Sequence, residues 1–436
     1  MKNSGIEWIG EIPDDWEVKR GKELFFEIND RCKNPENYPL LSVSEYYGVA
    51  PKSEKIDEGD FITHAETLDG YKICQKGDIV QNIMLAWKRA TGMSNYEGLI
   101  SPAYCIYRPY KSIDSKYYHY LFRTDVYADL FKQYSTGIID SRLRLYPAKF
   151  LSLKYAYPPK STQQCIATYL DKKCSKIEET IQNQQQVIEK LKAYKQSLIT
   201  EAVTGKVKIV NGKACGEYES YKDSGVEYLD RIPSDWNIKR LRYIGKCQNG
   251  ISKGGEFFGT GYPFVSYGDV YNNLVLPETV SGLIESTHEE QENYSVKAGD
   301  IFFTRTSETI EEVGFTSVCL KTIENATFAG FVIRVRPFTD EIIPDYSKYY
   351  FSSDAHRRFF VKEMNLVTRA SISQDLLKRL PVLIPSKEKQ KEIADYLDKK
   401  CTAIDTVIEQ KQNLIDKLTE YKKSLIYEVV TGKKEI

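Results

Sequence analysis

The chain has 436 residues, a length that allows about three domains, and it is 41% hydrophobic and 28% charged, as ordinary globular proteins are. The sequence contains no run of 18 apolar residues, so no membrane span is predicted. The first residues lack the apolar core of a signal peptide. Nine cysteines without a CxxC pair predict reduced thiols and a cytoplasmic location. The formal net charge is zero, so a nucleic-acid partner would require charge segregated onto one face or supplied by another subunit.

Two short markers open the two halves of the chain. Residues 4–20 read SGIEWIGEIPDDWEVKR, and residues 224–240 read SGVEYLDRIPSDWNIKR. In each copy a proline predicts a fixed turn, and a tryptophan three residues later predicts a core anchor. We interpret the markers as structural. Their anchoring residues are Pro13, Trp16, Pro233 and Trp236.

A variable body follows each marker. The first body, residues 21–157, has short alternating runs separated by Gly, Pro, Asn and Asp, a pattern that predicts a curled sheet. The second body, residues 241–384, repeats this outline. Three segments of the second body correspond to segments of the first: AGDIFFTR to KGDIVQNI, FVIRVRP to YCIYRP, and KYYFSSDAHRRFF to the helical pattern KYYHYLFRTDVYADLF. A shared frame with different loops is what two domains doing one job on two targets would look like.

A long amphipathic helix is predicted after each body. IATYLDKKC begins at Ile166 and IADYLDKKC at Ile393, an offset of 227 residues, and both helices run on to a Thr-Gly-Lys. Their apolar residues follow the four-three spacing of a coiled-coil seam. The main apolar seam positions are Leu170, Ile177, Ile181, Ile188, Leu191 and Leu198 in the first copy, and Leu397, Ile404, Ile408, Ile415, Leu418 and Leu425 in the second.

The two seams are natural partners, and their polar positions favour one direction of pairing. Parallel pairing in register would place Lys195 opposite Lys422 in one buried layer. Antiparallel pairing places Lys195 near Ile404 and Lys422 near Ile177, where each lysine can reach solvent. Such a seam spans about 50 Å and would act as a spacer. The alternative is an ordinary helical hairpin that only closes a domain.

Residues 207–223 show no periodicity and are predicted to be an exposed linker. The expected fold is α+β, with a pseudo-two-fold internal repeat and two mixed α/β domains held apart by a long antiparallel coiled coil. The expected divisions are a first domain (1–157), a central helix (158–206), the linker, a second domain (224–384) and a C-terminal helix (385–436).

The sequence contains no catalytic constellation of useful specificity. The four histidines are scattered, and neither His nor Cys clusters with the spacing of a metal site. The glycine-rich run GGEFFGTG (254–261) does not match a phosphate-binding motif, so we interpret it as a flexible loop with aromatic tips; close approach to a phosphate is the alternative. We therefore expect neither catalysis nor a metal or cofactor in this chain alone.

The order of markers, variable bodies and YLDKKC…TGK helices resembles the specificity subunit of type I restriction-modification systems. The runs LAWKRATGMSNYEGLISPAY (85–104), GEFFGTGYPFVSYGDVYNN (255–273) and DIFFTRTSETIEEVGF (300–315) are similar to recognition-domain signatures of that family. The resemblance covers nearly the whole chain, with several independent segments in the right order.

The resemblance implies that each body is a target-recognition domain reading one half of a split, asymmetric sequence in double-stranded DNA. Helix length would then set the unread gap. The implied partners are two modification (methyltransferase) subunits, which methylate adenine, and restriction subunits, which translocate and cut DNA. S-adenosylmethionine, ATP and Mg would be bound by those partners.

Candidate DNA-contacting residues follow from the chemistry of base readout, in which Arg or Lys recognises guanine and Asn or Gln recognises adenine. The candidates in the first body are Lys88, Arg89, Ser94, Asn95, Arg142 and Arg144, and those in the second are Lys253, Tyr267, Arg305, Thr306, Ser307 and Arg369. Each could instead be a solvated charge or a local ion pair. Arg142 and Arg369 recur at the helix offset and therefore suit phosphate contact or scaffolding better than sequence discrimination.

Two other functions compete with this hypothesis. A coiled-coil adaptor that bridges proteins without DNA recognition would have bodies that lack a basic concave face. A single-chain methyltransferase with fused recognition domains would carry methyltransferase motifs, which are missing from this sequence.

Overall fold

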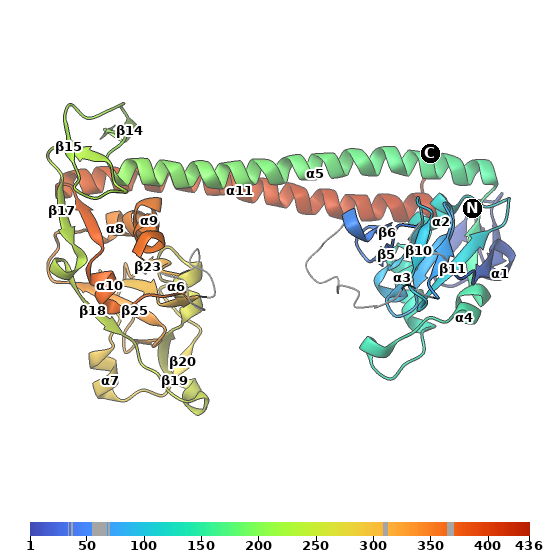
Figure 1. Ribbon diagram of the computed structural model, residues 1–436, viewed down its shortest axis with the longest axis horizontal. Helices are drawn as coiled ribbons and strands as arrows, with labels where there is room; N and C mark the ends of the chain where they lie inside the picture. The colour runs from blue at the N-terminus through green and yellow to red at the C-terminus, as the bar shows by residue number, and fades with distance from the viewer. Residues whose placement is uncertain (34, 36–37, 55–67, 69, 308–312, 364–369) are drawn as a thin grey trace. The chain divides into compact units, whose positions relative to one another are not determined.

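The computed structural model describes residues 1–33, 35, 38–54, 68, 70–307, 313–363 and 370–436. The chain divides into two compact units (Figure 1). The first unit comprises residues 1–185 and 413–436, and the second comprises residues 186–412. Each long helix therefore contributes one part to each unit, as the predicted internal repeat requires.

The two predicted long helices are α5 (Lys160–Val203) and α11 (Lys387–Val430), each of 44 residues, and they pack together (Figure 1). In the first unit Lys422 forms an ion pair with Glu178, and in the second Lys195 Nζ lies 2.6 Å from an oxygen of Asp405. These carboxylates directly follow the two isoleucines expected opposite the lysines, so the predicted antiparallel direction is confirmed.

The apolar stripe of both helices is turned away from solvent. Leu170, Leu397 and Leu425 are at most 1% exposed, and the neighbouring turns continue the pattern. The other buried seam positions are Ile177, Ile188, Ile404 and Ile415, and Ile181, Leu191, Leu198, Ile408 and Leu418 are half-buried. The four-three spacing thus produces a continuous buried stripe because side chains on successive turns cover the same face.

A glycine ends each long helix and packs against a marker. Gly432 and Gly205 have φ of +72° and +73°, the left-handed conformation common at helix C-termini. A Cβ at Gly205 would lie 2.4 Å from Cδ of Pro233 and 3.3 Å from Trp236, and a Cβ at Gly432 would meet the first marker in the same way. The Pro–Trp markers therefore serve as structural anchors for the helix ends, with Trp16 and Trp236 both buried.

The first unit is built from short strands and helices around a four-stranded antiparallel sheet ordered β4-β11-β8-β9. Its strands are β1 (Lys2–Asn3), β2 (Glu11–Ile12), β3 (Glu17–Arg20), β4 (Phe25–Ile28), β5 (Leu41–Ser44), β6 (Gly48–Pro51), β7 (Lys72–Cys74), β8 (Ile79–Asn82), β9 (Thr91–Met93), β10 (Gly98–Ile100), β11 (Tyr104–Pro109) and β12 (Lys154–Tyr157). Its shorter helices are α1 (Gly21–Leu24), α2 (Ser115–Phe122), α3 (Asp125–Gln133) and α4 (Pro147–Ser152), with 3-10 turns η2 (Lys52–Glu54), η3 (Ala86–Lys88) and η4 (Asp140–Arg142).

The second unit has a matching antiparallel sheet, ordered β18-β25-β21-β23. Its strands are β13 (Ile209–Val210), β14 (Lys213–Ala214), β15 (Tyr221–Asp223), β16 (Arg231–Pro233), β17 (Asn237–Arg240), β18 (Gly245–Asn249), β19 (Phe258–Val265), β20 (Leu283–Ile284), β21 (Ile301–Thr304), β22 (Thr306–Ser307), β23 (Thr316–Val318), β24 (Thr327–Phe328), β25 (Val332–Pro337), β26 (Ala370–Ser371) and β27 (Pro381–Ile384). Its shorter helices are α6 (Tyr267–Asn272), α7 (His288–Asn293), α8 (Pro344–Ser352), α9 (Asp354–Glu363) and α10 (Gln374–Lys378), with 3-10 turns η5 (Leu241–Tyr243) and η6 (Gly255–Phe257).

The matched strands carry the same buried ion pair. Asp78 is 2% exposed and accepts two hydrogen bonds of 2.9 Å from Arg108 across β8 and β11. Asp300, 1% exposed, accepts from Arg336 at 2.7 and 2.6 Å across β21 and β25. The side-chain hydrogen bonds to Asp78 raise the pKa of Arg108. The predicted correspondence of KGDIVQNI with AGDIFFTR, and of the two Arg-Pro strands, therefore holds in space.

The predicted alignment of the two KYY runs is wrong by three residues. Tyr117 and Tyr346 both donate their hydroxyl hydrogen bond to the last residue of a long helix, Val430 and Val203 respectively. A difference of 229 residues relates these tyrosines, whereas aligning the identical letters gives 232. The same 229-residue relation pairs Tyr120 with Tyr349, which donate to Asp171 and Asp398 at 2.8 and 2.7 Å.

The segment 207–223 is not the irregular linker that the sequence predicts. It contains β13, β14 and β15, and Ile209 is completely buried in the core of the second unit. Lys389 Nζ donates to the carbonyl oxygen of Ile209 at 2.9 Å, and the amide of Asn211 donates to Glu392 at 2.6 Å. The segment is therefore fastened to the first turns of α11. Two-residue strands are too short to give a periodic signal, which explains the wrong prediction.

Within the described residues, no helix is long and apolar enough to cross a membrane. The same residues hold no group of three or more His, Cys, Asp or Glu side chains that could bind a metal ion.

Candidate nucleic-acid interface

The predicted basic pair of the first body lies on η3 and the residue that follows it. Lys88 is exposed, and its ammonium group lies 5.3 Å from the ring centroid of Trp87. Arg89 adopts a left-handed backbone with φ of +67° and forms an ion pair with Asp125 at the start of α3. Lys88 can therefore reach a ligand directly, whereas Arg89 would first have to leave its carboxylate.

The predicted polar pair Ser94 and Asn95 divides between core and surface. Ser94 is completely buried, donates to the carbonyl oxygen of Tyr96 at 2.8 Å and accepts from the Tyr96 amide at 3.2 Å. Its hydroxyl forms the turn between β9 and β10 and is not available to DNA, so we drop Ser94 from the candidates. Asn95, at the tip of this turn, is exposed.

Arg142 and Arg144 lie on the loop between α3 and α4, and both are exposed. The backbone groups of Thr136 and Arg144 exchange two hydrogen bonds, of 2.9 and 3.0 Å, which close the loop. The alternate residues Leu143 and Leu145 are buried, so the extended backbone directs the two arginines outward. Within the described part of the chain, neither guanidinium has an ion pair or side-chain hydrogen bond.

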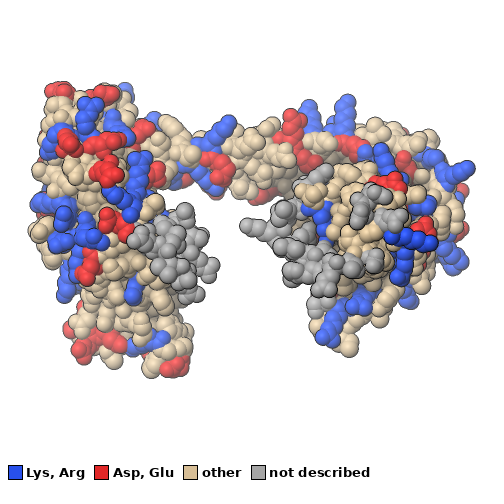
Figure 2. All heavy atoms as spheres, in the orientation of Figure 1, with Lys and Arg blue, Asp and Glu red and all other residues tan. Residues whose placement is uncertain are grey.

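Figure 2 shows Lys and Arg side chains gathered over the lower end of the first unit, where the α3–α4 loop projects in Figure 1. The large hydrophobic residues at the tip of that loop are also exposed: Ile138 is 99% exposed and Ile139 is 53% exposed. Neither isoleucine was among the site residues predicted from the sequence. A pair of adjacent isoleucines between Gly137 and Asp140, in a segment with no helical or strand period, was the available signal.

Lys253 of the second body is committed to contacts within its own unit. Its ammonium group donates to Glu290 Oε2 at 2.7 Å and to the carbonyl oxygen of Glu285 at 2.8 Å, and it lies 5.3 Å from the ring centroid of Phe257. The hydrogen bond from Lys253 lowers the pKa of the Glu290 carboxyl. We therefore drop Lys253 as a DNA contact: its charge is neutralised where it stands, and its side chain fastens α7 to the loop before η6.

Tyr267 and the residues after β21 meet in the second unit. The Tyr267 hydroxyl donates to the carbonyl oxygen of Thr306 at 2.9 Å. Arg305 is half-buried; its amide donates to Phe331 and its carbonyl accepts from Ile372, whereas its guanidinium has no partner among the described residues. Thr306 and Ser307 form β22. Arg369 lies outside the described residues.

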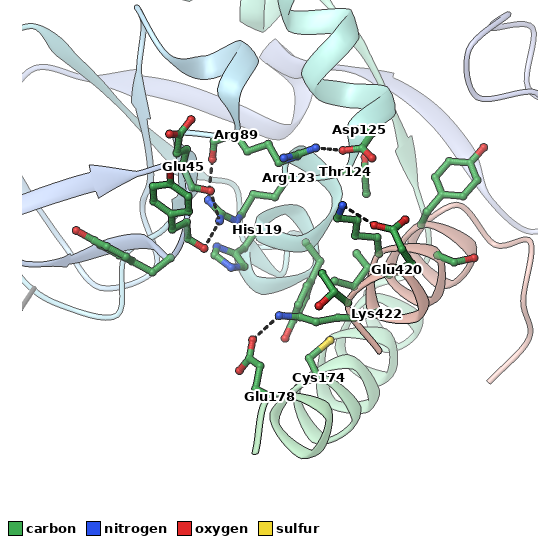
Figure 3. Close-up of a pocket in the computed structure, with 18 of the residues that line it drawn as sticks. Glu45, Arg89, His119, Arg123, Thr124, Asp125, Cys174, Glu178, Glu420 and Lys422 are labelled. Atoms are coloured by element: carbon green, nitrogen blue, oxygen red, sulfur yellow. Dashed lines mark hydrogen bonds and ion pairs between the residues drawn. The ribbon is translucent and has the colours of Figure 1, made fainter. Parts of the chain in front are cut away.

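One hollow in the first unit, with a volume of about 1010 Å³, adjoins α5 and α11 (Figure 3). Its basic groups already have partners. Arg123 donates five hydrogen bonds of 2.7–3.4 Å to backbone carbonyl oxygens, and burial lowers its pKa to about 10. Burial lowers the pKa of His119 to about 3, so its ring is neutral and accepts from the Met93 amide. Lys422 is paired with Glu178 (Figure 3), so this pocket has a structural character and no free acid–base pair.

Comparison with known proteins identifies the class of this fold. The family described as Type I restriction modification DNA specificity domain matches residues 233–417. The Type I restriction enzyme EcoKI specificity subunit of Escherichia coli (strain K12) is 24% identical over 425 residues, which are 92% of this chain and 85% of that protein.

Solved structures of such proteins share the architecture. One such chain comes from a structural study of complex assembly and conformational transition of the type I R-M system. It superposes on this chain with a TM-score of 0.72 at 14% identity, and the match covers 97% of this chain and all of that one. The HsdS subunit from Thermoanaerobacter tengcongensis gives 0.54 at 15% identity, covering 97% and 98%. The chain belongs to the specificity subunits of type I restriction-modification systems, and it is a DNA-binding, non-catalytic member of such a complex.

Proposed function

We propose that the two bodies, residues 1–157 and 224–384, are target-recognition domains that each read one half of a bipartite, asymmetric DNA sequence. The observation that carries this proposal is the internal comparison of the two units. Both units contain the same sheet order and the same buried Asp–Arg pair, yet the segments between the shared strands differ in length and structure. A duplicated frame that presents unlike loops suits two unlike half-sites.

The proposed DNA contacts follow from exposure and free hydrogen-bonding capacity. In the first body Arg142 and Arg144 suit phosphate contact, because both are exposed and unpaired in the described part of the chain. In the second body Arg305 suits base readout, because its guanidinium has no partner there and it directly follows the central strand β21. The remaining proposed contacts are Lys88, Arg89, Asn95, Tyr267, Thr306, Ser307 and Arg369.

We further propose that the paired helices set the gap between half-sites and dock two methyltransferase subunits, to which restriction subunits are added. The helices suit a ruler because each has 44 residues without interruption. The methyl donor, ATP and Mg would be bound by those partners. One heptad inserted into one helix would add about 10 Å to it. We expect that insertion to alter or abolish recognition while both bodies stay folded; an unchanged gap with full activity would rule out the ruler.

The decisive test is adenine methylation across a host genome that carries the encoded methyltransferase partner, with and without this chain. We expect a gapped, asymmetric motif to become methylated only when the chain is present. Unchanged methylation together with no duplex binding by the purified complex would overturn the proposal for this system and favour the coiled-coil adaptor. Binding of the purified complex to random genomic duplexes separates an adaptor, which does not bind them, from a specificity subunit whose methyltransferase is inactive.

A further inference from the structure

The tip of the α3–α4 loop presents two isoleucines to solvent. Ile138 is 99% exposed and Ile139 is 53% exposed. Single exposed apolar residues are common on protein surfaces. Two adjacent β-branched aliphatic side chains at the end of a projecting loop are a different feature, because they offer a narrow apolar surface that the described residues of the first unit leave largely exposed.

The loop that carries this tip is held in a defined shape. Its base is closed by the two backbone hydrogen bonds between Thr136 and Arg144, and the Leu145 amide donates to the Ile83 carbonyl oxygen at 2.9 Å. Gly137 is pressed against the far side of the loop, since a Cβ there would lie 2.6 Å from the carbonyl oxygen of Arg142. The isoleucines are therefore presented outward by an ordered base, which lowers the entropy lost when they bind.

Two arginines follow the apolar tip in the same loop. Arg142 and Arg144 are exposed and have no side-chain partner in the described part of the chain. The carboxylate within the loop, Asp140, is neutralised by Lys132 at 2.8 Å, and the same ammonium group lies 4.9 Å from the ring centroid of Trp87. A polyanion can thus approach the tip without meeting an uncompensated acid from the loop.

We propose that Ile138 and Ile139 form a reading tip that enters a groove of duplex DNA and makes apolar contact with the bases, while Arg142 and Arg144 hold the flanking phosphates. This inference rests on the proposed function and adds residues that determine specificity. Apolar side chains contact bases either at the methyl group of thymine or as a wedge against an unstacked base step. DNA is favoured over a protein partner because a stable protein interface buries about 800 Å² on each side, more than two side chains offer.

The test uses the full chain assembled with its methyltransferase subunits and a duplex that carries the methylated motif. The test variant is Ile138→Ser combined with Ile139→Ser. Loss of an apolar base contact lowers specific affinity by about ten- to a hundredfold, as a mismatched base pair does. The dependence of affinity on salt stays as in the wild type, because apolar contacts release no counterions. The matched control is Val361→Ser, which removes an aliphatic side chain that is 57% exposed on α9 of the second unit, and it leaves affinity unchanged.

Arg144→Ala provides the opposite signature. It weakens binding to all sequences alike and reduces the salt slope by about one, as expected for a lost phosphate contact. Replacing each thymine of the motif by deoxyuridine, one at a time, separates the two apolar modes. If one such replacement lowers wild-type affinity but not that of the double serine variant, the tip contacts that methyl group. If the fluorescence of 2-aminopurine placed at a base step increases on binding of the wild type and not of the variant, the tip acts as a wedge.

Three results would overturn the inference. One is unchanged discrimination between motif and scrambled duplex in the double serine variant. Another is loss of assembly with the methyltransferase subunits, which would make the tip a protein contact. The third is a wild-type complex that produces no methylated motif and binds no duplex; this result alone also removes the proposed function. Circular dichroism and the unfolding midpoint check that the variant is folded, which the exposure of both side chains leads us to expect.

Discussion

The central sheets of the two units hold the same ion pair at the same place, but the segments that leave those sheets share little. Between β4 and β8 the first unit forms the strands β5, β6 and β7. The corresponding segment of the second unit, between β18 and β21, forms β19, β20, α6 and α7, and its Phe264 and Val270 join Phe328 of β24 in a separate apolar cluster. The central sheet is therefore the same in both units, although the segments that connect its strands differ.

The mounted surfaces also differ in charge. The α3–α4 loop of the first unit offers two exposed arginines without a partner among the described residues, whereas in the second unit Lys253 is bound to Glu290 and lies beside the acidic helix α7. If both units bind DNA, they do so with different chemistry, and the second depends more on residues near β21 such as Arg305. This difference is the physical basis for expecting an asymmetric target.

The largest expected effect is on the methylated motif, and it comes from giving both units the same body. Replacing residues 241–384 by the first body, 21–157, should give a chain with two equal readers in equivalent frames. The methylated motif should then become symmetric about its gap, because both half-sites are read by the same loops. Methylation sequencing measures this directly. Replacing only the first body by an unrelated one should change one half-site and leave the other; a simultaneous change of both would contradict modular reading.

The shared frame can be tested through its buried ion pairs. Asp78→Asn and Asp300→Asn should each destabilise their unit by about 3 kcal/mol, because the charge-assisted hydrogen bonds between a buried carboxylate and a half-buried arginine are lost. Since the pairs are equivalent, the two costs should agree within about 1 kcal/mol. Glu278→Gln is the control. Its ion pair with Lys321 is about two-thirds exposed, and such pairs contribute less than about 1 kcal/mol. Denaturant unfolding measures all three; a large cost at only one of the two aspartates would contradict the equivalence.

Sequence reasoning succeeded where one physical rule decided the outcome. Two like charges do not share a buried layer, and this rule alone predicted the antiparallel helices that Lys195 and Lys422 confirm with their ion pairs. The Thr-Gly-Lys helix ends and the Pro–Trp markers were both recognised in the sequence. The contact between Gly205 and Pro233 could not be predicted, because no periodicity links a helix end to a distant turn.

Sequence reasoning failed where identical letters or isolated polar residues were taken as guides. The KYY runs align by letter, yet hydrogen bonds from Tyr117 and Tyr346 fix a register three residues away, and Lys348 occupies the position of His119. Ser94 was expected at the surface because hydroxyl groups usually are; its turn buries it. The exposed isoleucines of the α3–α4 loop ran against the expectation that large aliphatic residues are buried.

The contact between helix end and marker predicts a smaller, paired effect. Gly205→Ala and Gly432→Ala should each cost about 2 to 3 kcal/mol, because the new Cβ combines an unfavourable left-handed backbone with overlap onto a proline ring. Gly216→Ala separates these causes. Its φ is +82° and nothing lies within 4 Å of the added carbon, so only the backbone cost, about 1 kcal/mol, remains. Thermal unfolding provides the comparison, and equal costs at all three glycines would show that the Pro–Trp contact contributes nothing.

The smallest expected effect concerns acid sensitivity and the buried His356 of the second unit. Its ring nitrogens face the carbonyl oxygens of Ser353 at 2.8 Å and Gly314 at 3.3 Å, and burial lowers its pKa to about 3. A neutral ring has one N–H and can donate to only one of these oxygens.

In the unfolded chain this histidine takes up a proton near pH 6.5, whereas in the folded chain it stays neutral until about pH 3, so folding stability falls as the pH decreases between these values. At pH 5 the loss should be about 1 to 2 kcal/mol relative to pH 7.5. His356→Asn should be less stable than the wild type at pH 7.5 but should lose less on acidification. Denaturant unfolding of both proteins at the two pH values measures the difference. An equal loss in the variant would mean that His356 takes up its proton without unfolding, with its second N–H then bonded to the Gly314 carbonyl.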